Sequence, residues 1–281
     1  MSGWTLSLIE SPGHLIKSLG HFDASPFSAI ETMTDERDIA SIQLNAIGRV
    51  GSVAVAELFR IKTRSDERIV IEGDLSFLHG VGDAWTVRSL RIDGDVGGAT
   101  GSRMRGGAIE VVGNASDHAG CQMRGGVLDI HGNAGEFAGG PTPGQRSGMR
   151  GGRMIIRGNA GHHTGHRMRR GTVIVSGDVG GGVGSDMVAG TVVVGGRVGK
   201  DLGAGMRRGT IVLRADKNHA ALTDHNERFS SPRCQDLIIT RLVANDLQID
   251  APEIAERLFG PTLRRLGDRS AGGQGELWFV D

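Results

Sequence analysis

Arginine recurs at one position of a repeated pattern in this 281-residue sequence. It directly follows a methionine in five of six copies of the pattern, at Arg105, Arg124, Arg150, Arg169 and Arg207. The remaining copy has Val188 at this position. Guanidinium groups pair with carboxylates and phosphates through two parallel hydrogen bonds. This arginine column therefore predicts a surface that binds an anionic chain. The alternative is structural, with the side chains paired to nearby aspartates and carbonyl oxygens or stacked flat.

Three histidines lie within five residues, at His162, His163 and His166. They fall in a glycine-rich turn, and no cysteine or carboxylate stands at an established ligand spacing from them. We therefore expect no metal site and predict a solvated or partner-facing loop. His118 occupies the same repeat position as His163, which indicates a column of similar side chains.

Other catalytic signals are weak in this sequence. Each glycine-rich turn is followed by a strand pattern and not by a helix, which argues against a nucleotide-binding loop. The two cysteines, Cys121 and Cys234, are too few for a disulfide framework, an iron–sulfur cluster or a zinc site of four thiolates. Because no nucleophile with its base can be identified, we predict no catalytic residue and no cofactor held by this chain.

The elements that position these side chains follow from the period of the repeat. The six copies begin at methionines that lie 19, 26, 19, 19 and 19 residues apart, from Met104 to Met206. The longer interval is one period plus a seven-residue insertion around Pro141–Ser147. A fixed period of this size predicts a solenoid.

Each copy predicts one short strand and one set of sharp turns. Apolar residues alternate after the methionine, as in Ile109 and Val111, which is typical of a strand with one buried face. The rest of the copy reads Gly-x-x-Gly-x-x-x-Gly, and so many glycines would cost a helix about 1 kcal/mol each. We therefore predict a mainly β fold, a right-handed parallel β-helix with a single strand in each coil of about 19 residues.

The ends of the solenoid are less regular. Ile69–Asp74 and Leu90–Asp95 keep the strand-Gly-Asp part of the pattern without its Met-Arg start. We therefore predict a β-helix at 67–215, between an N-terminal cap or docking segment at 1–66 and a C-terminal cap at 216–281.

Within the caps, local patterns predict individual elements. Val53–Ile61 and Leu237–Ile239 are predicted as strands, and Asn226–Arg233 as a loop. One C-terminal helix is predicted across Glu253–Phe259, because Pro252 stands at its start and a glycine at its end. The apolar terminus Leu277–Val280 is expected to cap the solenoid or to dock on a partner.

The outward positions at the middle of the strands change character along the solenoid. They are Glu110 and Asp129 in the first two copies and become apolar in the last four, at Ile155, Ile174, Val193 and Val212. Large apolar patches are seldom left to water. This apolar stripe therefore predicts either cover by the tail of the chain or an interface with another subunit.

Composition narrows the class of partner. Glycine makes up 47 of the 281 residues, and the 32 basic residues equal the 32 acidic ones. A neutral chain argues against nucleic acid or an anionic membrane as the main partner. No apolar run is long enough for a signal peptide or a membrane span, so a cytoplasmic location is predicted.

The tandem Gly-x-x-Gly-x-x-x-Gly coils resemble three known domains. These are the C-terminal β-helix of the glutamate synthase large subunit, the third subunit of formylmethanofuran dehydrogenase, and the third subunit of its bacterial relative, the formyltransferase/hydrolase complex. We call the two third subunits β-helix subunits. This chain resembles them in its length and in the segment before the coils, where Leu44-Asn45 is followed by Val55–Phe59. Arginine far outnumbers lysine, which favours the bacterial complex over one from a thermophilic archaeon.

The resemblance implies a non-catalytic scaffold protein within a larger complex. Such complexes move a formyl group between tetrahydromethanopterin and a methanofuran-type or methylofuran carrier and release formate. The implied partners are an amidohydrolase-like subunit, a formyltransferase subunit and a further subunit. The carrier has a polyglutamate-like tail, whose carboxylates would suit the arginine column.

Three alternatives remain open from the sequence. The first is the β-helix subunit of a tungsten or molybdenum formylmethanofuran dehydrogenase, and the second is a self-associating structural solenoid. The third, a β-helix enzyme that cleaves polysaccharide, is disfavoured because the outward acids end at Asp129.

Overall fold

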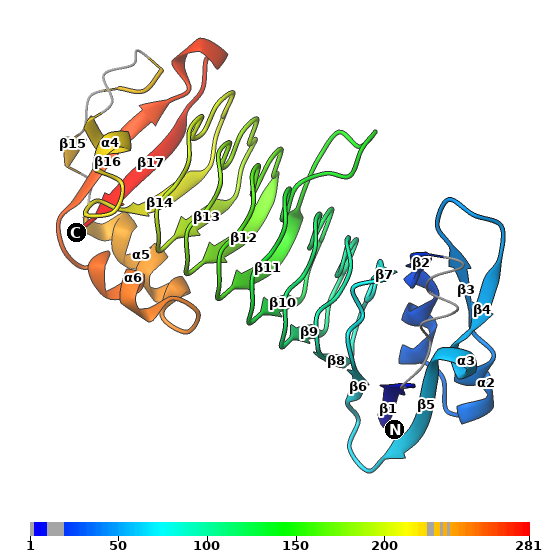
Figure 1. Ribbon diagram of the computed structural model, residues 1–281. Coiled ribbons are helices and arrows are strands. Elements are labelled where there is room, and N and C mark those ends of the chain that lie inside the picture. Colours follow the sequence, from blue (N-terminus) through cyan, green and yellow to red (C-terminus); the bar gives the residue numbers. More distant parts are fainter. Residues whose placement is uncertain (1–2, 10–19, 224–227, 231–232, 235–236) are drawn as a thin grey trace.

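The computed structural model describes residues 3–9, 20–223, 228–230, 233–234 and 237–281. Within these ranges the molecule is an elongated stack of coils with a smaller unit at each end (Figure 1). The strands form one 13-stranded sheet and one 4-stranded sheet, and the helices are short. The prediction of a mainly β fold is confirmed. None of the described helices is long and apolar enough to cross a membrane.

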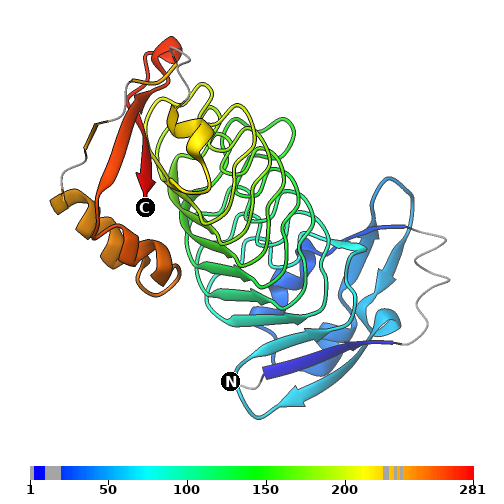
Figure 2. The same cartoon turned by 60° about the vertical axis from the view of Figure 1, so that its left-hand side comes forward.

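The stack is built from eight strands that pair in parallel in chain order. Each strand pairs with the next strand of the stack: Ile109 of β9 is the partner of Leu128 of β10, and Met154 of β11 is the partner of Val173 of β12. A second row of isolated bridges joins successive coils a few residues after the strands, from Leu75 with Val96 to Val179 with Val198. Figure 2 shows one turn of backbone for each strand. The strands are β6 (Ile69–Glu72), β8 (Ser89–Asp93), β9 (Ala108–Val111), β10 (Val127–Ile130), β11 (Arg150–Ile156), β12 (Arg170–Val175), β13 (Thr191–Val194) and β14 (Thr210–Arg214).

The core is a set of side-chain columns inside the coils. The six repeat methionines, from Met104 to Met206, are fully buried together with the inward residues of each strand. Each methionine reaches toward the next coil, where a Cβ at Gly152 would lie only 2.8 Å from the Cε atom of Met123. Gly152 also has a φ of +81°, which favours glycine. Methionine and glycine therefore recur together because one fills the space that the other leaves.

A ladder of asparagine and aspartate side chains joins the turns after the strands. The Asp95 Oδ1 atom accepts a hydrogen bond from the Asn114 backbone N–H at 2.7 Å, and the Asn114 Oδ1 atom accepts one from Asn133 at 2.8 Å. The same contact continues through Asn159 and Asp178 to the N–H of Arg197. These bonds satisfy turn N–H groups that have no strand partner, which explains the recurring Gly-Asn and Gly-Asp pairs.

The N-terminal unit adds one strand to the stack and a small sheet beside it. Strand β1 (Gly3–Leu8) pairs in parallel with β6 and antiparallel with β5 (Phe59–Arg64). Helix α3 (Val55–Leu58) interrupts the strand predicted at Val53–Ile61, because the Glu57 carboxylate accepts a hydrogen bond from the Ala54 N–H at 2.9 Å. The other elements are β2 (Phe22–Asp23), β3 (Gln43–Ala46), β4 (Ser52–Ala54), β7 (Leu78–His79), η1 (Ser25–Glu31) and α2 (Glu36–Ala40).

A buried carboxylate closes the first turn of the stack. Glu31, at the end of η1, is 8% exposed and accepts hydrogen bonds from the N–H groups of Val87 and Arg88 and from the Thr86 hydroxyl at 2.7–3.0 Å. Glu31 also accepts from the Thr86 N–H at 3.0 Å. In a later coil the N–H groups equivalent to those of Thr86 and Val87, at Arg124 and Gly125, donate to the Met104 carbonyl of the preceding coil. Glu31 therefore takes the place of a coil that the first turn lacks.

The C-terminal unit closes the other end. Strand β17 (Gly275–Val280) pairs in parallel with β14, so the apolar terminus caps the stack as its last strand. It also pairs with β16 (Thr262–Gly267), which pairs in turn with β15 (Arg233–Cys234). Among the described residues, these strands are accompanied by α4 (His219–Thr223), α5 (Leu237–Leu247), α6 (Pro252–Arg257) and the 3-10 helix η2 (Arg269–Ala271).

Two predictions for this unit are wrong, and a third is only partly covered. Leu237–Ile239 begins helix α5 and is not a strand, because Thr240, Ala244 and Leu247 are buried at helical spacing. The tail therefore holds more than the one helix predicted, which is present as α6. Half of the loop predicted at 226–233, residues 226–227 and 231–232, lies outside the described residues; 228–230 form neither helix nor strand, and Arg233 begins β15.

Candidate functional site

The arginine column lies where each coil enters its strand: four of its residues stand just before a strand, and Arg150 is the first residue of β11. Each of its residues follows a buried methionine, and its backbone N–H donates to the preceding coil, as that of Arg169 does to the Met149 carbonyl at 2.8 Å. These bonds hold the backbones one coil apart, about 4.8 Å. The side chains of all five predicted residues, Arg105, Arg124, Arg150, Arg169 and Arg207, are exposed.

Part of the column surrounds a hollow of about 490 Å³. Val188 and Ala189 line it where the column is interrupted, and Arg105 and Arg124 lie outside it. The arginines that line this arginine hollow are Arg150, Arg169, Arg170, Arg207 and Arg208. Sequence reasoning missed Arg170 and Arg208. The available signal was a second arginine after Met-Arg, where the other three Met-Arg copies have glycine.

The charge around the arginine hollow is of one sign. None of its lining residues is acidic. The Arg150 Nε and Nη2 atoms donate to the Ser147 hydroxyl at 3.0 and 2.8 Å. Across the described ranges, the other four arginines of the hollow form no salt bridge. Unneutralised guanidinium groups around one hollow are suited to binding a ligand with several negative charges.

The apolar stripe is covered by the chain itself. Its four residues, Ile155, Ile174, Val193 and Val212, are at most 4% exposed. They form one buried cluster with Ala244 and Leu247 of α5, with Ala255 of α6 and with Trp278 of β17. The prediction that these residues meet another subunit is therefore corrected. The helices of the tail already bury them, because an outward apolar strand face needs an apolar cover.

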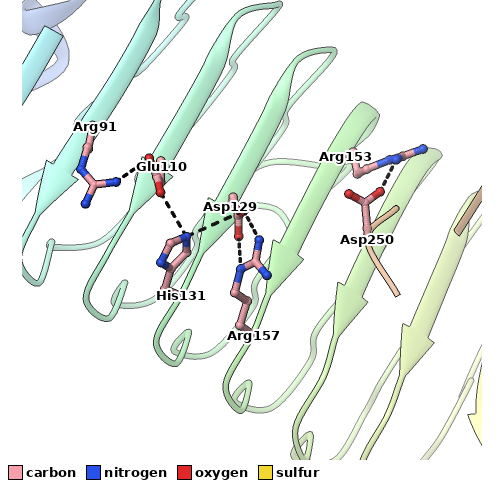
Figure 3. A network of polar contacts seen from close by, with 7 residues as sticks. All are labelled: Arg91, Glu110, Asp129, His131, Arg153, Arg157 and Asp250. Atoms are coloured by element: carbon pink, nitrogen blue, oxygen red, sulfur yellow. Dashed lines mark hydrogen bonds and ion pairs between the residues drawn. The ribbon is translucent and has the colours of Figure 1, made fainter. Parts of the chain in front are cut away.

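The uncovered half of the same sheet face has charged residues that pair with one another. Figure 3 shows the network on β8–β11. Arg91 contacts Glu110 at 2.8 Å, and Arg157 contacts Asp129 at 2.6 Å. The hydrogen bond to Glu110 raises the pKa of Arg91, and the bond to Asp129 raises the pKa of Arg157. The His131 Nε2 atom lies 3.3 Å from the Glu110 carboxylate and links the two pairs.

The boundary between the two halves is marked by one further ion pair. Arg153, on β11, pairs with Asp250, which lies between α5 and α6 (Figure 3). The pair joins the sheet to the edge of the helical cover, which is the layer that α5 and α6 form over the apolar stripe.

The histidine-rich turn forms a ladder of rings. Phe137 stacks between His118 and His163, with ring centroids 5.2 and 4.8 Å away. The column predicted from these two histidines is therefore present. His166 lies beside it, with its Nδ1 atom 3.0 Å from the Ser185 carbonyl, and burial lowers the pKa of His166. The same Nδ1 atom lies 2.8 Å from the Ser185 hydroxyl oxygen.

The fold and the site together define a class: a repeat protein of stacked one-strand coils that presents an arginine-lined hollow at its turns. No protein-family model matches the chain, and no curated protein matches it. Among solved structures, the chain is similar to a chain in the crystal structure of the formyltransferase/hydrolase complex (FhcABCD) from Methylorubrum extorquens, in complex with methylofuran. The two are 30% identical over 99% of each chain, with a TM-score of 0.82. This protein therefore belongs to the family of that chain of the formyltransferase/hydrolase complex.

Proposed function

We propose that this protein is the β-helix subunit, a non-catalytic scaffold, of a formyltransferase/hydrolase complex. The observation that carries the proposal is the match over the full length of a chain of such a complex, at 30% identity. An elongated stack with two capped ends suits a scaffold, because it offers several separate faces to other polypeptides.

The proposed complex moves a formyl group between tetrahydromethanopterin and a methanofuran-type carrier and releases formate. Its other members are an amidohydrolase-like subunit, a formyltransferase subunit and a further subunit, in the cytoplasm. The matched complex was crystallised with methylofuran, which supports a carrier of this type. The match to a formyltransferase/hydrolase complex also favours membership of that hydrolytic complex over membership of a tungsten or molybdenum formylmethanofuran dehydrogenase.

We further infer that the stack at 67–215 is a right-handed β-helix, with cap segments at 1–66 and 216–281. The parallel pairing of successive strands supports this hand. Connections between parallel strands of one sheet are right-handed in about 98% of cases.

The arginine column is proposed to contact the carrier. It presents five exposed guanidinium groups, at Arg105, Arg124, Arg150, Arg169 and Arg207, to which a carrier with several carboxylates could bind. This role belongs to the complex as a whole and requires no bond-breaking residue in this chain.

Co-purification from the native host tests the scaffold role. A tagged copy expressed at its natural level is expected to bring down three other polypeptides in fixed ratio, together with formyl-transfer and formate-releasing activity. An untagged strain processed in parallel is the control. Recovery of the protein alone, or only as copies of itself, would remove the scaffold proposal and favour a self-associating solenoid.

A further inference from the structure

The arginine hollow differs from the rest of the arginine column in a way that indicates its ligand. In the first three Met-Arg copies a glycine follows the arginine, so each coil presents one guanidinium group. In the coils of Met168 and Met206 a second arginine follows, which gives the pairs Arg169-Arg170 and Arg207-Arg208. The coil between these pairs has Val188 and Ala189. Two arginine pairs therefore stand on either side of a coil with small apolar side chains.

The pairing of the strands brings like charges together here. Arg150 and Arg170 are direct partners across β11 and β12, where the register shifts before Arg153. Like charges at directly opposite positions destabilise a sheet. Among the described residues, no carboxylate lines the hollow to relieve this repulsion. A bound anion between the two guanidinium groups would relieve it.

The spacing of the arginines sets the size of the ligand. The two arginine pairs lie two coils apart, which is about 10 Å. The coil of Arg150 extends the row by about 5 Å more. One phosphate or carboxylate contacts one or two guanidinium groups, so it cannot engage the whole row. The ligand that fits must have several anionic groups distributed over about 10–15 Å.

The floor of the hollow determines what joins those anionic groups. Val188 and Ala189 are half-buried apolar residues that line the space between the arginine pairs. Methylene groups lie favourably on such a surface, whereas sugars would lose hydrogen bonds to water there. The chain also has no overall basic surplus of the kind expected for nucleic-acid binding.

We propose that the arginine hollow binds an extended polycarboxylate, with carboxylates paired to Arg170 and Arg208 as well as to Arg169 and Arg207, and with its carbon linkers on Val188 and Ala189. This inference rests on the proposed function, in which the arginine column meets an anionic carrier. It places the densest part of that contact at the arginine hollow, in the C-terminal half of the column.

Binding of hexaglutamate to the purified full chain tests the proposal by isothermal titration calorimetry. The wild-type protein is expected to bind hexaglutamate saturably, and inorganic phosphate or a short oligonucleotide much more weakly. The double variant Arg170→Gln/Arg208→Gln should weaken binding at least about tenfold, because two charge-assisted pairs are lost. The control, Arg37→Gln/Arg60→Gln, removes the same charge from two exposed arginines outside the arginine column and should change binding less than about twofold.

A third variant separates shape from charge. Val188→Arg adds a positive charge but fills the hollow, so the proposal expects weaker binding of hexaglutamate. Tighter binding by this variant, or equal losses in the two double variants, would show a diffuse electrostatic surface and overturn the proposal. Absence of saturable binding by the folded wild-type chain would also overturn it. Unchanged circular dichroism and melting temperature show that each variant is folded.

Failure of the polycarboxylate site and failure of the scaffold role would give different results. The Arg170→Gln/Arg208→Gln variant leaves the backbone and the capped ends unchanged, so it should still co-purify with the other subunits. Co-purification without hexaglutamate binding would reject the polycarboxylate site and keep the scaffold. Hexaglutamate binding by a chain that purifies alone would reject the scaffold and keep the site.

Discussion

The two halves of the coil stack share one interior and differ on their outer surfaces. From β8 to β10 the central outward residues, Arg91, Glu110 and Asp129, are charged, partly exposed and held in ion pairs. From β11 to β14 the central outward residues are apolar and lie beneath α5 and α6, and Trp278 of β17 continues their row at the end of the sheet. The turns differ in the same direction, with single arginines followed by glycine in the first half and the arginine hollow in the second.

The residues that build a coil are the same in both halves, whereas the residues on its outer surface differ. The buried methionines, the inward strand residues and the asparagine ladder recur in both halves, because every coil must pack on its neighbours in the same way. The outward positions have no such constraint. Departures from the repeat, such as Val188 and Arg208, therefore indicate where a coil has a local role.

The largest effect is expected from a charge placed beneath the helical cover. Val193 is fully buried in the apolar stripe, so Val193→Asp should lower the free energy of unfolding by about 3–5 kcal/mol, because it buries a carboxylate without a partner. Urea unfolding followed by circular dichroism measures the change. Glu110 occupies the same repeat position in the uncovered half, and Glu110→Gln should cost less than about 1 kcal/mol. Equal costs at the two positions would contradict the division of this face.

Because the two halves share one interior, truncating a repeat methionine should lower the free energy of unfolding equally in both. Met123 and Met187 are both fully buried and contact the next coil in the same manner. Met123→Ala and Met187→Ala should each destabilise the protein by about 2–5 kcal/mol through lost burial and a cavity. The two values, from the same urea titrations, should agree within about 1 kcal/mol. A negligible cost at one of them would show that the coils are not equivalent inside.

The ion pair at the boundary is expected to have a local and smaller effect. Asp250→Asn removes the contact with Arg153 and should loosen the helical cover by about 1 kcal/mol, because the pair is only partly buried. Faster hydrogen exchange of the amides of α5 and α6, measured by mass spectrometry, is the expected result. Asp129→Asn breaks the pair with Arg157 in the uncovered half and should leave this exchange unchanged. Faster exchange in both variants would argue against a specific role for Asp250.

The smallest effect is expected from pH. Burial lowers the pKa of His166 in the coil stack, and burial together with His21 lowers the pKa of His79 in the N-terminal unit. Below the ordinary histidine pKa of about 6.5 the unfolded chain therefore binds more protons than the folded one, so stability falls as the pH falls from there toward the lowered pKa. His166→Asn should reduce this loss and leave the part that is due to His79. Melting temperatures at pH 7.5 and 5.5 check the difference, and an unchanged difference would contradict it.

The repeat interior could be predicted from the sequence because each position recurs. The alternation of Ile109 with Val111, repeated in every copy, indicated the strands, and the structure has them at those residues. The C-terminal unit could not be predicted in the same way, because it has no repeat. Leu237–Ile239 is too short an apolar run to separate a strand from the first turn of a helix, and burial of Ala244 against the stripe decides it.

For the arginine column and the apolar stripe, the sequence predicts which residues stack but not what covers or surrounds them. A fixed period by itself determined that equivalent residues stack in columns, because identical coils place identical positions one above another. Only the tertiary structure decided that α5 and α6 cover the stripe, since this contact joins residues far apart in the chain. It also decided that Val188 lines a hollow together with Arg170 and Arg208, because a hollow depends on the relative size and direction of side chains from several coils.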